Sequence, residues 1–88
     1  MRIIHKYTLE ITDEQTITVS PGFEFLSAQV QDGKLCIWAI VDIMSSKIKK
    51  TFIIIGTGLR IHDENNLSYR ATVQMGEYVW HLFELLDE

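Results

Sequence analysis

The sequence predicts an all-β fold, a single small antiparallel sandwich or barrel of about seven strands that are mostly connected by hairpins. Short segments in which apolar and polar residues alternate recur along the chain, and this period of two is typical of half-buried strands. The segments are rich in β-branched and aromatic residues. Turn residues separate them at intervals of roughly ten residues. No repeat or linker interrupts the pattern, so residues 1–88 are expected to form a single β-rich domain.

The first two strands are expected to form a hairpin. Residues Arg2–Ile11 alternate, with mostly apolar side chains at the odd positions. The polar residues 12–15 predict a turn, and Thr16–Val19 alternates again over a short second strand. A loop of about four residues suits an antiparallel pair.

A second hairpin is predicted after the strongest break in the chain, Ser20-Pro21-Gly22, where Pro presets φ and Gly permits a positive φ. Residues Phe23–Gln31 alternate between two faces. Asp32-Gly33 is a preferred pair for a two-residue type I′ turn. Residues Lys34–Asp42 then return with apolar side chains on both faces, so this strand is expected to lie well inside the sheet system.

The segment Thr51–Ile61, TFIIIGTGLRI, is the expected central strand. The four consecutive apolar residues 52–55 indicate burial on both faces, and Gly56 to Gly58 then end or bend the strand. Residues Ile43–Lys50 before it have no clean period, and they are expected to form a loop or a single helical turn.

The last third of the chain is expected to contain another hairpin. A polar loop at residues 62–68 precedes a strand at Tyr69–Gln74, and Met75-Gly76-Glu77 predicts a tight turn. Residues Tyr78–Leu85 then form the final strand. A short helix at Val79–Leu86 is the alternative because its apolar residues also fit helical spacing, but the β-branched and aromatic content favours a strand.

The size and composition of the chain indicate a soluble, cytoplasmic protein. The N-terminal stretch turns polar too soon for a secretory signal, and no apolar run approaches the length of a membrane span. The single cysteine, Cys36, lies in an apolar run and is expected to be a small buried residue in a reducing compartment. Because a chain of 88 residues buries only a modest core, association into a homo-oligomer is expected to add stability.

The net charge of −4 at pH 7 disfavours general nucleic-acid binding, which depends on clustered Lys and Arg. The one basic cluster, at residues 47–50, is interpreted as a solvated loop. The three histidines lack metal-ligand spacing, and no Cys lies near them. We therefore expect no metal, no cofactor and no membrane association.

Gly56-Thr57-Gly58 is the first candidate for a binding site. It is not a dinucleotide fingerprint, which needs a third glycine before a helix, and it is not a Walker loop, which ends in Gly-Lys-Ser/Thr. The simpler interpretation is a bulge or strand terminus. The alternative is a set of backbone amides that binds a ligand's anionic group, with two arginines at the pocket edge and a tryptophan that stacks on a base. The candidate ligand-binding residues are Gly56, Thr57, Gly58, Arg60, Arg70 and Trp80.

The histidines form no recognisable catalytic motif. His62 precedes Asp63 and Glu64 in a polar loop, where a carboxylate can orient an imidazole, although a solvated loop is the simpler interpretation. His81 lies beside Trp80 and is interpreted as a hydrogen-bonded interior or interface residue. No nucleophile, base and orienting group occur at a familiar spacing, so no catalytic residue is assigned.

Three segments carry a resemblance to a known group of proteins, namely EITDEQTITVSPGFEFLSAQVQDGKLCIWAIVD, FIIIGTG and ATVQMGEYVWHLFE. They resemble small proteins of unknown function found in phages and prophages of bacteria. The similarity runs over most of the chain. It implies no activity and no site residues. It does imply a context, because small acidic phage products often bind something of the host, including components of antiviral defence.

The leading expectation is therefore a small non-enzymatic phage-type binding protein that acts on a host component. It would block a host protein, or it would sequester a nucleotide signal. The acidic composition and the aromatic side chains favour blocking, whereas the glycines near Arg60 and Arg70 favour nucleotide capture. A small hydrolase that uses His62 and Asp63, or His81, is one alternative. A structural virion or assembly module is another, and it would equally suit the expected homo-oligomer.

Overall fold

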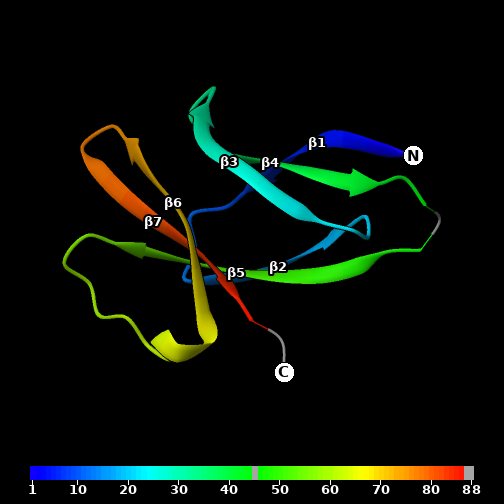
Figure 1. Ribbon diagram of the computed structural model, residues 1–88. Coiled ribbons are helices and arrows are strands. Elements are labelled where there is room, and N and C mark those ends of the chain that lie inside the picture. The colour runs from blue at the N-terminus through cyan, green and yellow to red at the C-terminus, as the bar shows by residue number, and fades with distance from the viewer. Residues whose placement is uncertain (45, 87–88) are drawn as a thin grey trace.

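The computed structural model describes residues 1–44 and 46–86 (Figure 1). Within these ranges the chain forms seven strands and one short 3-10 helix. In chain order they are β1 (Arg2–Leu9), β2 (Glu14–Val19), β3 (Glu24–Gln31), β4 (Lys34–Asp42), β5 (Ile48–Gly56), η1 (Glu64–Asn66), β6 (Leu67–Met75) and β7 (Tyr78–Leu85). The described residues contain no helix that is long and apolar enough to cross a membrane.

The described strands form two antiparallel sheets that pack face to face (Figure 1). The three-stranded sheet has the order β1-β4-β3, and the four-stranded sheet has the order β2-β5-β7-β6. The all-β prediction with seven strands is confirmed. Because the two sheets stay separate, the fold is a sandwich and not a closed barrel, which decides between the two predicted architectures.

The predicted hairpin around Asp32-Gly33 is confirmed. These two residues connect β3 to β4, and their φ values are 53° and 75°. A type I′ turn requires a positive φ at both central positions. β6 and β7 form the other hairpin, in which Met75 lies opposite Tyr78. The C-terminal segment Tyr78–Leu85 is thus a strand, as predicted, and not the alternative helix.

The predicted hairpin between the first two strands is wrong. β1 pairs with β4 and β2 pairs with β5, so residues 10–13 carry the chain from one sheet to the other. The N–H of Glu10 donates to Oε1 of Gln15 at 3.0 Å, and Nε2 of Gln15 donates to the carbonyl of Glu10 at 2.6 Å. These bonds close the connection without a ladder between β1 and β2. Hairpins join only β3 to β4 and β6 to β7 among the described strands, which is fewer than the sequence predicts.

β5 is the interior strand that the sequence predicts, since it lies between β2 and β7. Its bounds are Ile48–Gly56, whereas Thr51–Ile61 was expected. Residues 48–50 belong to the strand and not to a loop or a helical turn, because they pair with Ile17, Thr18 and Val19 of β2. Of the segment expected before the strand, Ser45 lies outside the described residues.

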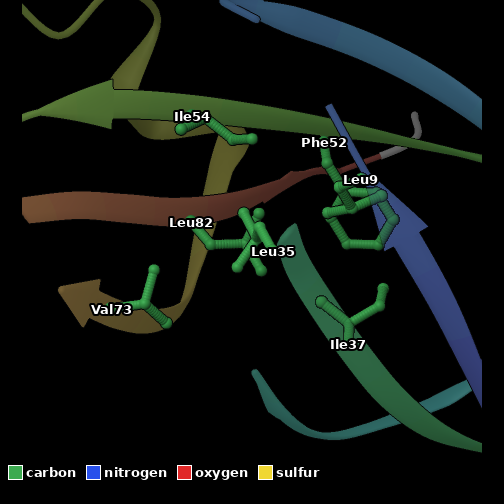
Figure 2. Packing of buried hydrophobic residues seen from close by; sticks show 7 residues of the cluster. All are labelled: Leu9, Leu35, Ile37, Phe52, Ile54, Val73 and Leu82. Atoms are coloured by element: carbon green, nitrogen blue, oxygen red, sulfur yellow. The ribbon is translucent and has the colours of Figure 1, made fainter. Parts of the chain in front are cut away.

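The hydrophobic core lies between the two sheets (Figure 2). Five strands contribute to it, and its buried side chains are Leu9, Leu35, Ile37, Phe52, Ile54, Val73 and Leu82. Burying one such side chain contributes about 1.5–3 kcal/mol. Cys36 is buried, as predicted. On β5, Ile53 and Ile55 point away from the core and are half-buried. The strand is therefore fully buried on one face only, whereas burial on both faces was expected.

Candidate functional site

Loop 57–66 joins β5 to β6 and starts with a tight turn. The N–H of Leu59 donates to the carbonyl oxygen of Gly56 at 3.1 Å, and Gly58 has a φ of 89°. A positive φ at the third residue is the requirement of a type II turn, and it explains the glycine there. At the other end of the loop, the N–H of Leu86 donates to the carbonyl oxygen of Asn66 at 2.7 Å, which ties the loop to the end of β7.

A pocket of about 340 Å³ lies between this loop and β5. Its half-buried apolar side chains, here called the pocket floor, are Ile53, Ile55, Leu67 and Leu85. Its exposed polar side chains, here called the pocket rim, are Asp13, Glu14, Arg60, His62 and Asp63. Small-molecule sites range from about 300 to 1,000 Å³ and combine apolar walls with a few polar groups. The pocket has the size and the lining of such a site.

The pocket rim carries more negative than positive charge. Three carboxylates, those of Asp13, Glu14 and Asp63, accompany the single guanidinium of Arg60. The ion pairs found among the described residues include none of these four side chains. Their charges are therefore not compensated within the described part of the chain, and a ligand can meet them directly.

The structure places the candidate residues Gly56, Thr57 and Gly58 at the end of β5 and in the turn. The N–H of Thr57 donates to the carbonyl oxygen of Val79 at 3.2 Å, and the next turn bond goes from Leu59 to Gly56. The N–H groups of Thr57 and Leu59 therefore already donate hydrogen bonds within the chain. A Cβ added at Gly56 would lie 3.1 Å from Cζ3 of Trp80, so the glycine permits close packing of strand and indole.

The candidate residues Arg60, Arg70 and Trp80 are not brought together. Arg60 lies on the pocket rim. Arg70 lies between the sheets, where its Nε donates to Oε1 of Glu84 at 3.1 Å. Trp80 packs against the core and stacks on Tyr78 with ring centroids 5.9 Å apart. Of the six candidate residues, Gly56 lies against the indole of Trp80, and Arg60 alone lines the pocket.

The histidines occupy two different sites. His62 and Asp63 both line the pocket rim. His81 lies on β7, where Nε2 is 2.7 Å from Oγ1 of Thr57 and Nδ1 is 2.9 Å from Oγ1 of Thr72. The hydroxyl of Tyr69 lies 2.7 Å from that same Thr72 oxygen. Both imidazole nitrogens of His81 therefore have hydroxyl partners, and the chain of polar groups runs from loop 57–66 across β7 to β6. The described residues contain no group of three or more His, Cys, Asp and Glu that could hold a metal ion.

Most of the pocket lining was not predicted from the sequence. Ile53 and Ile55 alternate with the core residues of β5, and this alternation is the one signal that could have assigned them to an outer face. Asp13 and Glu14 reach the pocket because β2 pairs with β5, with Glu14 opposite Ile53. No local pattern links these acids to loop 57–66.

The chain belongs to the family described as DUF7352, a domain of unknown function, whose family model matches residues 1–88. The comparison with curated proteins and the comparison with solved structures both found no match. The family therefore covers the whole chain and assigns no activity to it.

Proposed function

We propose that this DUF7352 domain is a small non-enzymatic binding protein that holds a small ligand in the pocket between loop 57–66 and β5. The observation that carries the proposal is an apolar pocket floor beneath a charged, uncompensated pocket rim. Binding is favoured over acid–base catalysis because His62 is exposed on the pocket rim, whereas His81, whose two ring nitrogens have hydroxyl partners, does not line the pocket.

The charge of the pocket rim favours a ligand with an apolar body and a cationic group. Two carboxylates come from one side of the pocket, at Asp13 and Glu14, and a third comes from Asp63 of the loop. Together they attract a positive group, while the apolar body lies against the pocket floor. Arg60 adds one contact for an acceptor atom on the same ligand.

Sequestration of a nucleotide signal is the second candidate function. The observation in its favour is the presence of Arg60 and His62 on one rim, where both can contact a phosphate. A phosphate at this rim, however, would also lie near three carboxylates, which repel its negative charge. Trp80 packs against the core and offers no stacking surface in this pocket. The geometry therefore supports a nucleotide less well than an amphipathic cation.

The proposed setting is the cytoplasm of a bacterial host, where a phage-type protein acts on a component of antiviral defence. The resemblance to small phage products supports this setting, and the net charge of −4 suits a cationic ligand or partner. Blocking a host protein is the other form of the same proposal. It is favoured by Tyr69 and Tyr78, which are 56% and 66% exposed.

A thermal-shift experiment with three matched probes tests the ligand class. Benzylamine, benzyl alcohol and benzoate share one apolar ring and differ in charge at neutral pH. We expect benzylamine to raise the Tm most, because a ligand that binds only the folded state stabilises it in proportion to RT ln(1 + [L]/Kd). A cyclic mononucleotide forms the fourth arm, and a larger shift with it would favour nucleotide capture. No shift with any of the four probes would contradict a ligand pocket of this chemistry.

Asp63→Asn provides the site variant and Asp32→Asn its matched control. Both aspartates have a positive φ, of 52° and 53°, and Asn tolerates this conformation as well as Asp does. Asp63 lines the pocket, whereas Asp32 lies in the β3–β4 turn. The benzylamine shift should fall in the first variant only.

A further inference from the structure

A hydroxyl and an imidazole are in hydrogen-bond contact just after the end of β5. Oγ1 of Thr57 lies 2.7 Å from Nε2 of His81, and Nδ1 of the same ring lies 2.9 Å from Oγ1 of Thr72. None of the three side chains lines the pocket. Thr57 is exposed, so a reagent in solution can reach its hydroxyl. A nucleophile in contact with a base, with a third group holding that base in place, is the arrangement of activated hydroxyl nucleophiles.

The backbone presents Thr57 on a sharp turn between two glycines. β5 ends at Gly56, and the bond from the N–H of Leu59 to the carbonyl oxygen of Gly56 turns the chain directly after the strand. In α/β hydrolases the nucleophile also sits on a sharp turn after a strand, and the N–H of the next residue contacts the oxyanion. Here the next residue is Gly58, and its N–H has no hydrogen-bond acceptor within residues 1–44 and 46–86. This N–H can therefore donate to a carbonyl oxygen that is attacked at Thr57.

The ring of His81 serves as a base for Thr57 when its own proton is on Nδ1. In this tautomer Nδ1 donates to Oγ1 of Thr72, and Nε2 accepts from the hydroxyl of Thr57. The oxygen of Thr72 has two lone pairs, so it can also accept from the hydroxyl of Tyr69, 2.7 Å away. Thr72 is exposed, and its own proton can go to water. Thr72 is therefore a positioning residue that favours the tautomer in which Nε2 can take a proton.

We propose that Thr57 is an acyl-acceptor site that reacts with small acyl thioesters. Oγ1 of Thr57 attacks the carbonyl carbon while Nε2 of His81 takes the hydroxyl proton, and the N–H of Gly58 donates to the oxyanion. The carbon–sulfur bond then breaks, and the imidazolium returns the proton to the departing thiolate. The products are an ester at Thr57 and a thiol.

The class of acyl donor follows from the modest stabilisation that this site offers. A single N–H and no cation contact the oxyanion, so the donor needs a leaving group that departs readily as an anion, as a thiolate or a phenolate does. The modification goes beyond the proposed ligand binding and does not depend on it, because the reacting side chains lie outside the pocket.

Incubation with the acetyl thioester of N-acetylcysteamine, followed by peptide mass spectrometry, tests the site. We expect an acetyl group at Thr57 that hydroxylamine removes, because an ester is cleaved by hydroxylamine whereas an acetylated lysine is not. Thr16 and Thr51 are the internal control, since their hydroxyls lie 2.7 Å apart and pair with each other instead of with an imidazole. They should stay unmodified. Acetyl groups on amines alone, or on Thr16 and Thr51 as fast as on Thr57, would overturn the inference.

His81→Gln tests the base. The amide of Gln can still form a hydrogen bond with Thr57 but cannot take its proton, so acetylation of Thr57 should slow about 100-fold, the lower end of a general-base contribution. Circular dichroism checks that the variant is folded. An unchanged rate would mean that Thr57 reacts without His81, and the proposal would fail.

Two variants of Thr72 test the positioning of the ring without removing the base. The ¹⁵N signals of the His81 ring should show the proton mainly on Nδ1 in the wild type. Thr72→Val should shift the proton toward Nε2 and slow the acetylation of Thr57, whereas Thr72→Ser should restore both. A wild-type ring that carries its proton mainly on Nε2 would contradict the proposal, because Nε2 could not then act as the base.

Discussion

Arg70 of β6 and Glu84 of β7 form a double contact between neighbouring strands of the four-stranded sheet. Nε and Nη2 of Arg70 lie 3.1 and 3.0 Å from the same carboxylate oxygen, Oε1, and Nζ of Lys50 lies 2.8 Å from the other, Oε2. Glu84 is only 5% exposed. The two cations approach aromatic rings, with Lys50 5.6 Å from the centroid of Phe23, just before β3, and Arg70 6.0 Å from that of Phe25 on β3. The carboxylate of Glu84 on β7 thereby pairs with two cations, and these cations pack against Phe25 of β3 and against Phe23 just before it.

Glu84→Gln should destabilise the fold by about 3 kcal/mol, because removing the carboxylate leaves two cations without their counter-charge. This value is at the lower end for a buried pair, since the side chains of Lys50 and Arg70 remain 25% and 31% exposed. Glu64→Gln, an exposed change, should stay within about 0.5 kcal/mol. Urea denaturation of both variants measures the difference. A loss below about 1 kcal/mol for Glu84→Gln would show that the cations find other partners.

Gly56→Ala should destabilise the chain by about 1–3 kcal/mol through overpacking. The added methyl would lie 3.1 Å from Trp80 and 3.3 Å from Leu59, so the indole must move. Gly58→Ala is the comparison, because nothing lies within 4 Å of its added methyl and the cost there comes from a φ of 89°. In a Trp38→Phe background, fluorescence should report a shifted Trp80 emission for Gly56→Ala only. Equal emission in the two variants would refute the close packing.

The bond between Thr57 and His81 should appear as an energetic coupling. Thr57→Val removes the hydroxyl 2.7 Å from Nε2, and we expect a loss of about 1 kcal/mol. In a His81→Phe background the same change should cost less, because the partner is already absent. A double-mutant cycle measures the difference, which we expect to be about 0.5–1 kcal/mol. Additive costs would mean that the two side chains do not interact in solution.

Phe52→Ala should cost about 3–5 kcal/mol, the usual range for a large aromatic lost from a core. Phe52 is 0% exposed and lies in the centre of β5. Its neighbour Ile53 faces the pocket, so Ile53→Ala should cost less. Thermal denaturation of the two variants compares the faces of one strand. Equal losses would show that the outer face is packed as tightly as the core.

Local patterns predicted the strands and the hairpins β3–β4 and β6–β7, but not the partners of β1, β2 and β5. Alternation marked β3, apolar side chains on both faces marked β4, and β-branched and aromatic content marked β7. Asp32-Gly33 marked the type I′ turn. All these features depend on neighbouring residues. The partners of β1 and β2 depend on contacts far along the chain. The same holds for the start of β5 at Ile48, since residues 48–50 alternate poorly and become a strand by pairing with β2.

The candidate site was predicted less well than the fold, because it combines distant segments. The sequence directed attention to Gly56–Gly58 and Arg60, and loop 57–66 does border the pocket. Arg70 adjoins a bulge between Tyr69 and Ala71, and the pairing of β6 with β7 brings it near Glu84. The acids Asp13 and Glu14 reach the pocket only through the pairing of β2 with β5. Neither relationship has a local sequence signal.

The most direct test of the proposed pocket is an NMR titration of the ¹⁵N-labelled chain with benzylamine and, separately, with benzoate. Benzylamine should shift the amide signals of residues 13–14, 53–55 and 57–63, because its ammonium meets the pocket rim and its ring meets the pocket floor. Benzoate should shift them less at the same concentration. If benzylamine leaves these amides unchanged, or shifts only residues outside the pocket, then loop 57–66 does not bound the ligand site that we propose.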